Sequence, residues 1–243
     1  MTNDSWPKAV FTDSKNTLFA WDPIWVESCA HILQKYGSTM EPFKFWELWV
    51  TGMAGENHKA AFGRYRTFTE TLQVALMNAF HYAGIPGSPD DVHFMNDIWD
   101  EVLPYPDVVP ALTKIQERVP VFIYSNVETE YLDMMVAKLA PFTPAFVGDM
   151  EKSHSRKPSP FSYRWVLDTA GKQLGLDLRY EDVLYVAGPQ WDVQAAMSLG
   201  MTGVWIHRFY GEAVSDHIGA QVEGVEPHYQ VDTLDEVIKI VGA

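Results

Sequence analysis

Short apolar runs alternate with helical patterns from about residue 105 onward, and this alternation restricts the possible folds more than any other feature. Buried strands are predicted at about 120–126, 144–149, 182–188 and 202–207. Helices are predicted at about 107–118, 128–139, 160–173, 190–199 and 233–241. Strands that alternate with helices form parallel sheets with right-handed crossovers, so the sequence predicts an α/β fold.

One further strand, at about residues 8–13, precedes a long block in which no strand is evident. Between about residues 22 and 103 the apolar residues recur at helical spacing, with Gly37 and Gly84 as predicted helix ends and Ser88-Pro89 as a predicted helix start. We therefore expect two domains. Residues 1–20 and 105–243 would form a Rossmann-like parallel-sheet core, and residues 21–104 an inserted all-helical cap.

Composition narrows the class of protein. The 243 residues are 47% hydrophobic and 21% charged, as in ordinary globular proteins. The 18 basic and 32 acidic residues give a net charge of −14, which disfavours nucleic acid as a partner. Cys29 is the only cysteine, so no intramolecular disulfide forms. With no apparent signal peptide or membrane span, we expect a soluble cytoplasmic protein without a membrane partner.

Polar residues follow several of the predicted strands. Asp13 ends the first strand, Ser125 and Asn126 end the second, and Asp192 follows the strand at about 182–188. The segment "SRKPSPFSY" places Lys157 near a helix start between them. Each residue alone is ordinary turn or cap chemistry. Because the carboxyl ends of parallel strands meet at one edge of a sheet, their joint placement predicts a functional site there.

These residues resemble the four motifs of the haloacid dehalogenase superfamily: Asp13 with Thr17-Leu18, then Ser125-Asn126, then Lys157, then Asp192. The resemblance covers nearly the whole chain, including a helical cap directly after the first motif. "KPSPFSY" and "WDVQAAMSLGMTGVWIHR" are similar to segments of the 2-haloacid dehalogenase branch. The resemblance implies a homodimeric hydrolase that acts on a small carboxylic acid and needs no cofactor.

The resemblance also implies a covalent mechanism, in which Asp13 displaces a leaving group from carbon and water then hydrolyses the aspartyl ester at the aspartate's own carbonyl carbon. Residue chemistry supports this independently, because a carboxylate beside a lysine stays ionised and nucleophilic. Lys157 would hold Asp13 ionised, with Tyr163 in support, and Thr17 would hydrogen-bond within the nucleophile loop.

Further roles follow from the same resemblance. Ser125 and Asn126 would bind the substrate carboxylate or the leaving group. Asp192 would either position Lys157 or activate the hydrolytic water. The cap is rich in aromatic residues at helical spacing, which is typical of core or dimer packing or of an apolar lid over the substrate. We include Tyr163, Trp21 and Trp49 among the candidate substrate-binding residues.

Two positions argue against the metal-dependent phosphatases of the superfamily, which resemble an Asp-x-Asp pattern and carry a further acidic residue before the final aspartate. Lys15 stands at the second aspartate position and Pro189 at the additional acidic position. Two carboxylates that phosphoryl transfer with Mg²⁺ would use are therefore replaced. We expect neither a metal ion nor phosphatase activity.

Other differences from the 2-haloacid dehalogenase branch leave the identity of the leaving group undecided. The branch usually has an apolar residue and a glycine where Lys15 and Asn16 stand, and a serine where Ala187 stands. Val50 aligns with an arginine of the branch's cap that helps to bind halide, while Arg64 and Arg66 lie further along at a different spacing. Two alternatives to halide displacement therefore remain: ring opening, as in the related azetidine-2-carboxylate hydrolase, and an inactive binding protein with this fold.

Overall fold

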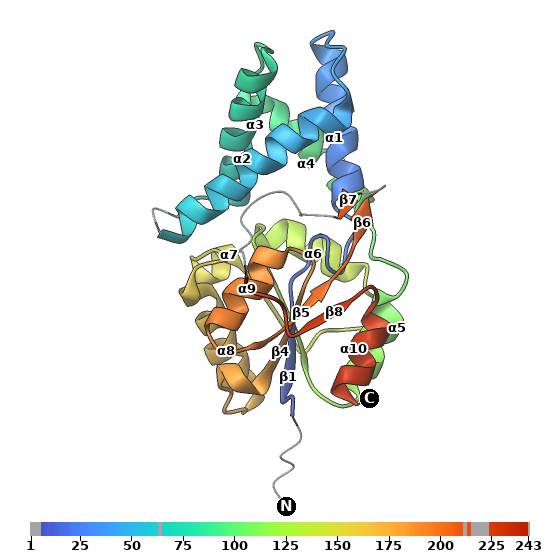
Figure 1. The fold of residues 1–243 in the computed structure, drawn as a ribbon, viewed down its shortest axis with the longest axis vertical. Helices are drawn as coiled ribbons and strands as arrows, with labels where there is room; N and C mark the ends of the chain where they lie inside the picture. The colour runs from blue at the N-terminus through green and yellow to red at the C-terminus, as the bar shows by residue number, and fades with distance from the viewer. Residues whose placement is uncertain (1–5, 63–64, 211–212, 215–223, 243) are drawn as a thin grey trace, which may run out of the picture.

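The computed structural model describes residues 6–62, 65–210, 213–214 and 224–242. Six strands form one parallel sheet in the order β3-β2-β1-β4-β5-β8 (Figure 1). Their bounds are β1 (Ala9–Thr12), β2 (Val121–Ser125), β3 (Phe146–Asp149), β4 (Val183–Ala187), β5 (Thr202–Ile206) and β8 (Tyr229–Val231). The predicted α/β class with a parallel sheet is confirmed.

β1 lies in the middle of the sheet, where Val10 is paired with Val121 of β2 and with Leu184 of β4. Successive residues of β1 face opposite sides of the sheet, since Val10 and Phe11 belong to separate hydrophobic cores. All four residues of the strand are fully buried. The residue that follows β1 therefore emerges at the centre of the sheet edge.

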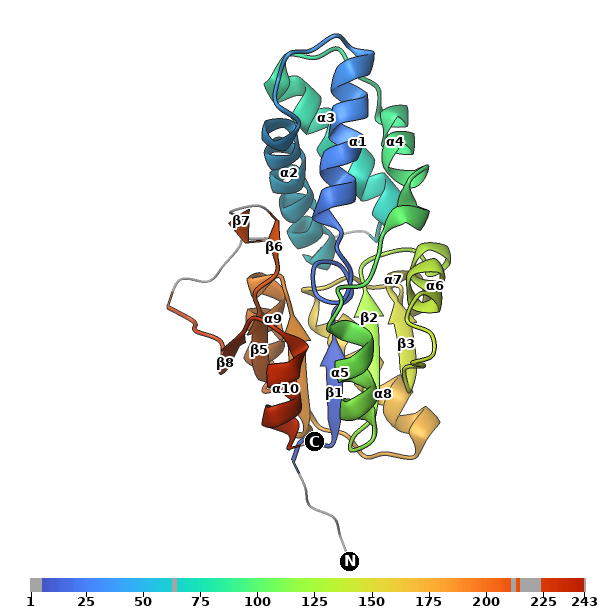
Figure 2. The same cartoon turned by 90° about the vertical axis from the view of Figure 1, so that its right-hand side faces the viewer.

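Helices cover both faces of the sheet (Figures 1 and 2). α8 (Pro160–Leu174) and α9 (Gln190–Ser198) pack on the face that includes Phe11. α5 (Val108–Gln116), α6 (Thr129–Ala137) and α10 (Leu234–Val241) contribute to the core on the other face. The remaining short elements of the core are α7 (Met150–Ser153), η3 (Tyr180–Asp182), β6 (Phe209–Tyr210) and β7 (Ala213–Val214).

A helical unit lies beyond the carboxyl ends of the strands (Figures 1 and 2). It comprises α1 (Asp22–Lys35), α2 (Pro42–Phe62), α3 (Phe68–Ala83), η1 (Pro89–Val92), α4 (His93–Asn96) and η2 (Trp99–Glu101). Its interior is aromatic. The ring centres of Trp25 and Trp49 lie 5.5 Å apart in an edge-on arrangement, and those of Trp21 and Trp99 lie 4.2 Å apart with the rings tilted. None of the helices in the described part of the chain combines the length and hydrophobicity of a membrane span.

Local signals explain several helix ends. α3 begins with a capping box, in which the Thr67 hydroxyl accepts from the Glu70 amide and the Glu70 carboxylate accepts from the Thr67 amide. It ends before Gly84, whose φ of 66° lies in the left-handed region that favours glycine. The predicted helix end at Gly84 is thus confirmed.

The structure corrects several predicted elements, since α7, β6, β7 and β8 were not predicted and one predicted helix is divided. β8 was not predicted, because a three-residue strand has no readable periodicity and forms here only by pairing with β5. The segment from Ser88, predicted as one helix, is divided into η1, α4 and η2. Its Asp91 carboxylate accepts from the Tyr36 hydroxyl at 2.6 Å and pairs with Lys35, so contacts with α1 hold this segment.

Candidate active site

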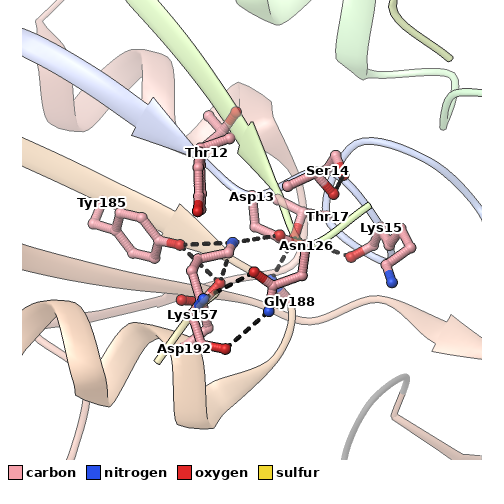
Figure 3. Close-up of polar contacts among 12 residues, drawn as sticks. Thr12, Asp13, Ser14, Lys15, Thr17, Asn126, Lys157, Tyr185, Gly188 and Asp192 are labelled. Atoms are coloured by element: carbon pink, nitrogen blue, oxygen red, sulfur yellow. Dashed lines mark hydrogen bonds and ion pairs between the residues drawn. The ribbon is translucent and has the colours of Figure 1, made fainter. Parts of the chain in front are cut away.

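Loops that follow β1, β2 and β4 meet at one edge of the sheet, and a fourth loop, between α7 and α8, contributes Lys157 (Figure 3). Asp13, Asn126 and Asp192 reach this edge from the first three loops and the start of α9. The parallel register of β1 with both neighbours brings them together although they are far apart in sequence.

Asp13 is 5% exposed and lines a cavity above the sheet edge. Its Oδ1 accepts from Lys157 Nζ at 2.5 Å, and its Oδ2 accepts from Thr17 Oγ1 at 3.0 Å. Its backbone nitrogen donates to Val186 O of β4 at 3.0 Å. One oxygen is therefore held by a cation and the other by a neutral hydroxyl, with the backbone fixed to the sheet.

Thr17 connects two loops. Its Oγ1 donates to Asp13 and accepts from the Gly188 amide at 2.8 Å. A Cβ at Gly188 would lie 2.0 Å from Asn16 O, so only glycine allows the loops to approach this closely. Arg208, at 6% exposed, donates to Thr17 O at 3.0 Å and so also supports the loop after β1.

Asn16 stands where the resembling family has glycine, and it adopts a φ of 54°. Its Oδ1 accepts from the amides of Trp21 and Asp22 at 3.2 Å, and its Nδ2 donates to Asp22 Oδ1 at 2.8 Å. Asparagine tolerates the left-handed conformation better than most residues. Here it also joins the loop after β1 to the start of α1.

Lys157 is 1% exposed and lies between two carboxylates (Figure 3). Its Nζ donates to Asp13 Oδ1 at 2.5 Å, to Asp192 Oδ2 at 2.6 Å and to Tyr185 OH at 3.1 Å. Burial alone would lower the pKa of this ammonium. The charges of Asp13 and Asp192 and their hydrogen bonds outweigh burial, so the pKa is raised above the ordinary lysine value.

Asp192 is fully buried beneath Lys157, and both its carboxylate oxygens are occupied. Oδ1 accepts from Tyr163 OH at 2.5 Å, and Oδ2 accepts from Lys157 and from Tyr185 OH at 2.7 Å. Burial and the Asp13 charge raise the pKa of Asp192, while Lys157 and the Tyr163 hydroxyl oppose the rise. The geometry suits a group that positions Lys157. Tyr163 supports it from behind and does not line the cavity.

Asn126 and Ser125, predicted to bind substrate, are engaged with the protein. Asn126 Oδ1 accepts from the Lys157 amide at 2.8 Å, and its Nδ2 donates to Lys157 O at 2.9 Å. Asn126 thus clamps the backbone of Lys157, although it also lines the cavity. The Ser125 hydroxyl is fully buried and accepts from Ser14 Oγ at 2.6 Å, apart from the cavity lining.

The cavity lies between the sheet edge and the helical unit. The space open to the centre of a water molecule is about 50 Å³, so the cavity suits a small ligand. Its floor consists of Asp13, Lys15, Asn126, Lys157, Pro189 and Trp191. Its opposite wall consists of Trp21, Trp25, Val50, Met53, Ala54 and Asn57.

Of the two tryptophans predicted to bind substrate, only one lines the cavity. Trp21 lines the cavity, as predicted for a substrate-binding residue. Trp49 is fully buried, donates from Nε1 to Leu72 O at 3.0 Å and packs between α2 and α3. It does not line the cavity, because its face of α2 is turned toward α3.

Two positive charges line the cavity. Besides Lys157, the Lys15 ammonium lies 3.7 Å from the centre of the Phe68 ring and 5.3 Å from that of Trp21. These ring contacts fix the position of the Lys15 ammonium. Arg66 pairs with Glu56 at 2.8 Å and does not line the cavity, while Arg64 lies outside the described residues.

Several lining residues were not predicted. Val50, Met53, Ala54 and Asn57 follow the spacing i, i+3, i+4, i+7, so one face of α2 forms the wall. A polar residue on that apolar stripe is the sequence signal that would have identified Asn57. Trp191 also joins the core to the helical unit, because the centre of its ring lies 5.9 Å from that of His58 on α2.

No group of three or more potential metal ligands from His, Cys, Asp or Glu occurs in the described ranges. The carboxylates of Asp13 and Asp192 both pair with Lys157 Nζ. The ammonium thus occupies the space between them.

No protein-family model matches the chain, and no curated protein matches its sequence. Solved structures do match. The L-2-haloacid dehalogenase from Xanthobacter autotrophicus matches with a TM-score of 0.76 at 22% identity, over 97% of this chain and 98% of that one. The same enzyme with chloropropionic acid covalently bound matches equally, at 21% identity with the same coverage.

A HAD phosphatase from Thermococcus onnurineus also matches, with a TM-score of 0.59 at 19% identity, over 97% of this chain and 98% of that one. The dehalogenases are therefore closer in fold than this phosphatase. At sequence identities of 19–22% these comparisons establish the fold alone. The chain has the fold of the L-2-haloacid dehalogenases, helical unit included, and the predicted resemblance is confirmed at that level.

Proposed function

We propose that this protein is a metal-independent hydrolase that acts at C2 of a small 2-substituted carboxylic acid through an aspartyl ester on Asp13. The contact between Asp13 Oδ1 and Lys157 Nζ at 2.5 Å, on the floor of a small cavity, carries the proposal. The buried ammonium pairs with the carboxylate, and carboxylates can act as nucleophiles at carbon. The same ammonium bridges Asp13 and Asp192, which supports a reaction without a bridging metal ion.

The two carboxylate oxygens of Asp13 accept from different donors, and we infer from this difference which oxygen attacks the substrate. Oδ2, held only by the neutral Thr17 hydroxyl, keeps more electron density than Oδ1, which is held by an ammonium. Oδ2 therefore attacks: the Oδ2–C2 bond forms, and the bond from C2 to the leaving group breaks with its electron pair. The apolar wall of Trp21, Trp25 and Val50 limits competing water during this step.

Hydrolysis of the ester uses the other oxygen. Oδ1 is then the ester carbonyl oxygen, and Lys157 stabilises the negative charge that develops on it when water adds to the aspartate carbonyl carbon. The Cγ–Oδ2 bond breaks and Oδ2 leaves as the product hydroxyl. One proton of the water neutralises that oxygen and the second is released, so Asp13 returns as a carboxylate.

Lys15 provides the recognition of the acid. Lys15 lines the cavity two residues after Asp13, and its ammonium lies 3.7 Å from the centre of the Phe68 ring. A substrate carboxylate that pairs with this ammonium would lie at the cavity that Asp13 also lines. A small acid fits the cavity volume, and the neighbouring structure with covalently bound chloropropionic acid supports this substrate class.

The test is to incubate the protein, in EDTA, with each enantiomer of 2-chloropropionate and of azetidine-2-carboxylate and to follow products by mass spectrometry. Released chloride with a 2-hydroxy acid would identify a dehalogenase, and a 2-hydroxy-4-amino acid would identify the ring-opening alternative, which Val50 in place of a cap arginine favours. Asp13→Asn should abolish either reaction, because a neutral amide does not attack carbon.

Two further outcomes bear on the mechanism. A single turnover in H₂¹⁸O should place ¹⁸O in Asp13 and leave the product unlabelled. Label in the product would mean that water attacks the substrate directly. If none of these acids, nor a panel of other 2-substituted acids, produces turnover or a mass adduct on Asp13, the remaining alternative is an inactive binding protein.

A further inference from the structure

The cavity wall opposite Asp13 contains one polar side chain whose position is set by an unusual contact. Asn57, on α2, lines the cavity, and its Oδ1 accepts from Arg156 Nη2 at 2.5 Å. Arg156 is 1% exposed and comes from the core loop that also carries Lys157. The residue before the catalytic lysine thus reaches across to the helical unit.

Arg156 bonds only to neutral oxygens among the described residues. Its Nη1 donates to the Thr71 hydroxyl and, at 3.2 Å, to Thr67 O. Burial lowers the pKa of this guanidinium to about 10 despite nearby acidic groups. A buried arginine without a carboxylate on its guanidinium is costly, so it indicates a positioning role.

The contact with Arg156 fixes the orientation of the Asn57 amide. A guanidinium only donates hydrogen bonds, so the Asn57 atom that contacts it is the oxygen and the amide cannot be reversed. The Nδ2 group then lies on the other side of the amide. It has no hydrogen-bond partner within the described parts of the chain.

Reaction geometry gives this amide its function. Displacement at carbon requires the leaving group to depart opposite the nucleophile, and Asp13 lies on the cavity floor. The leaving group therefore moves toward the wall formed by α2, where Val50, Met53 and Ala54 are apolar. The indole nitrogens of Trp21 and Trp25 are buried and inaccessible.

We propose that Asn57 Nδ2, oriented by Arg156, donates a hydrogen bond to the departing group and makes the site selective for a halide. This inference rests on the proposed function and selects between its two leaving groups. A departing halide takes the bonding electron pair and gains negative charge, which an N–H donor stabilises. A ring amine would need an acceptor, and the Asn57 oxygen is occupied. Asn57 touches the reacting atoms, whereas Arg156 is a positioning residue.

Asn57→Asp is the sharpest variant, because it is isosteric, keeps an oxygen for Arg156 and removes the N–H donor. We expect kcat with 2-chloropropionate to fall about 100-fold or more, with KM changed much less, because the leaving-group charge develops only in the transition state. Asn78→Asp, an exposed asparagine on α3 outside the cavity, makes the same charge change on the helical unit and should stay within about 2-fold.

Arg156→Met tests the positioning role. It should lower kcat, and combining it with Asn57→Ala should cost little more than either change alone, because both remove the same interaction. Thr71→Val removes another Arg156 acceptor but leaves the Asn57 contact, so it should change kcat only a few-fold. Additive losses from Arg156→Met and Asn57→Ala would assign Arg156 a separate structural role and overturn this part.

Bromide binding tests the role of Asn57 independently of the reaction at Asp13. Tryptophan fluorescence of the wild-type protein should respond saturably to bromide, and Asn57→Asp should weaken the apparent affinity at least 10-fold while Asn78→Asp does not. Equal bromide affinity in Asn57→Asp, or no binding by wild type, would overturn the role of Asn57 whether or not Asp13 is alkylated. Absence of an Asp13 adduct would instead contradict the proposed function.

Discussion

Gly188 donates from its backbone amide to Thr17 Oγ1 at 2.8 Å, and this contact fixes the loop after β4 against the nucleophile loop after β1. The same hydroxyl donates to Asp13 Oδ2. The orientation of the Asp13 carboxylate therefore depends on how closely the two loops approach, and that distance depends on the absence of a side chain at Gly188.

Gly188→Ala should impair catalysis more than stability. The added Cβ would lie 2.0 Å from Asn16 O, so the loops must separate and Thr17 loses its donor. We expect a destabilisation of about 1–3 kcal/mol and a loss of most turnover, measured by thermal unfolding and product formation. Gly55→Ala is the control: it lies exposed on α2 with open space around it, so it should be neutral or slightly stabilising. Full activity in Gly188→Ala would contradict the role given to Thr17.

Lys157→Met should abolish turnover and destabilise the fold by about 3–5 kcal/mol, because Asp13 and Asp192 would be left buried together without a cation. Lys8→Met is the matched control, since Lys8 pairs with Asp182 at 3.1 Å at a more exposed position and should cost at most about 1 kcal/mol. Urea unfolding of both variants measures the difference. A Lys157→Met protein as stable as the control would mean that the carboxylates are neutral in the fold.

The pKa shifts predict the pH dependence of stability. The pKa of Lys157 is raised in the fold, so its contribution is complete below the unfolded value of about 10.4 and is lost as pH rises through the folded value. Asp192 acts at the acidic end. Its pKa is also raised, so stability from this group falls as pH rises from about 3.9 to the folded value.

Activity should follow the same two groups. Turnover requires ionised Asp192 and protonated Lys157, so kcat should have an acid limb above the ordinary aspartate range and no limb from Lys157 below about pH 10.4. Rates measured from pH 4 to 10 check this, with chemical denaturation at each pH. An alkaline limb near neutrality that disappears in a lysine-to-arginine variant at position 157 would show that Lys157 titrates there.

Lys15→Met should weaken substrate binding selectively. Removing an ammonium that binds a carboxylate costs about 1.5–3 kcal/mol, which corresponds to about a 10- to 160-fold rise in KM. The amide of the same acid, which carries no charge, should be unaffected. Lys44→Met, on the exposed surface of α2, serves as control. Equal effects on the acid and its amide would mean that Lys15 supports the cavity through packing on Phe68 and Trp21 and does not bind the carboxylate.

The order of β1 to β5 and of the longer helices was readable from the sequence, since apolar periodicity reports how each segment buries one face. Asp13, Lys157 and Asp192 could be grouped from their positions in the sequence, because residues after parallel strands emerge at one edge of a sheet. The lysine at position 15 and the proline at position 189 were also informative, since they replace carboxylates. The element order and the grouping depend on local pattern and on one general rule of sheet topology, whereas the meaning of positions 15 and 189 depends on the resemblance to the haloacid dehalogenase superfamily.

Contacts across the boundary between core and helical unit depended on tertiary structure. Asn126 holds the backbone of Lys157, Trp49 faces α3, and Arg156 reaches Asn57 across 99 positions of sequence. Periodicity shows that a residue faces inward but not which distant segment it meets. That choice is made when α2 docks over the sheet edge, because only the packed arrangement determines which inward-facing groups share a cavity and which find partners elsewhere.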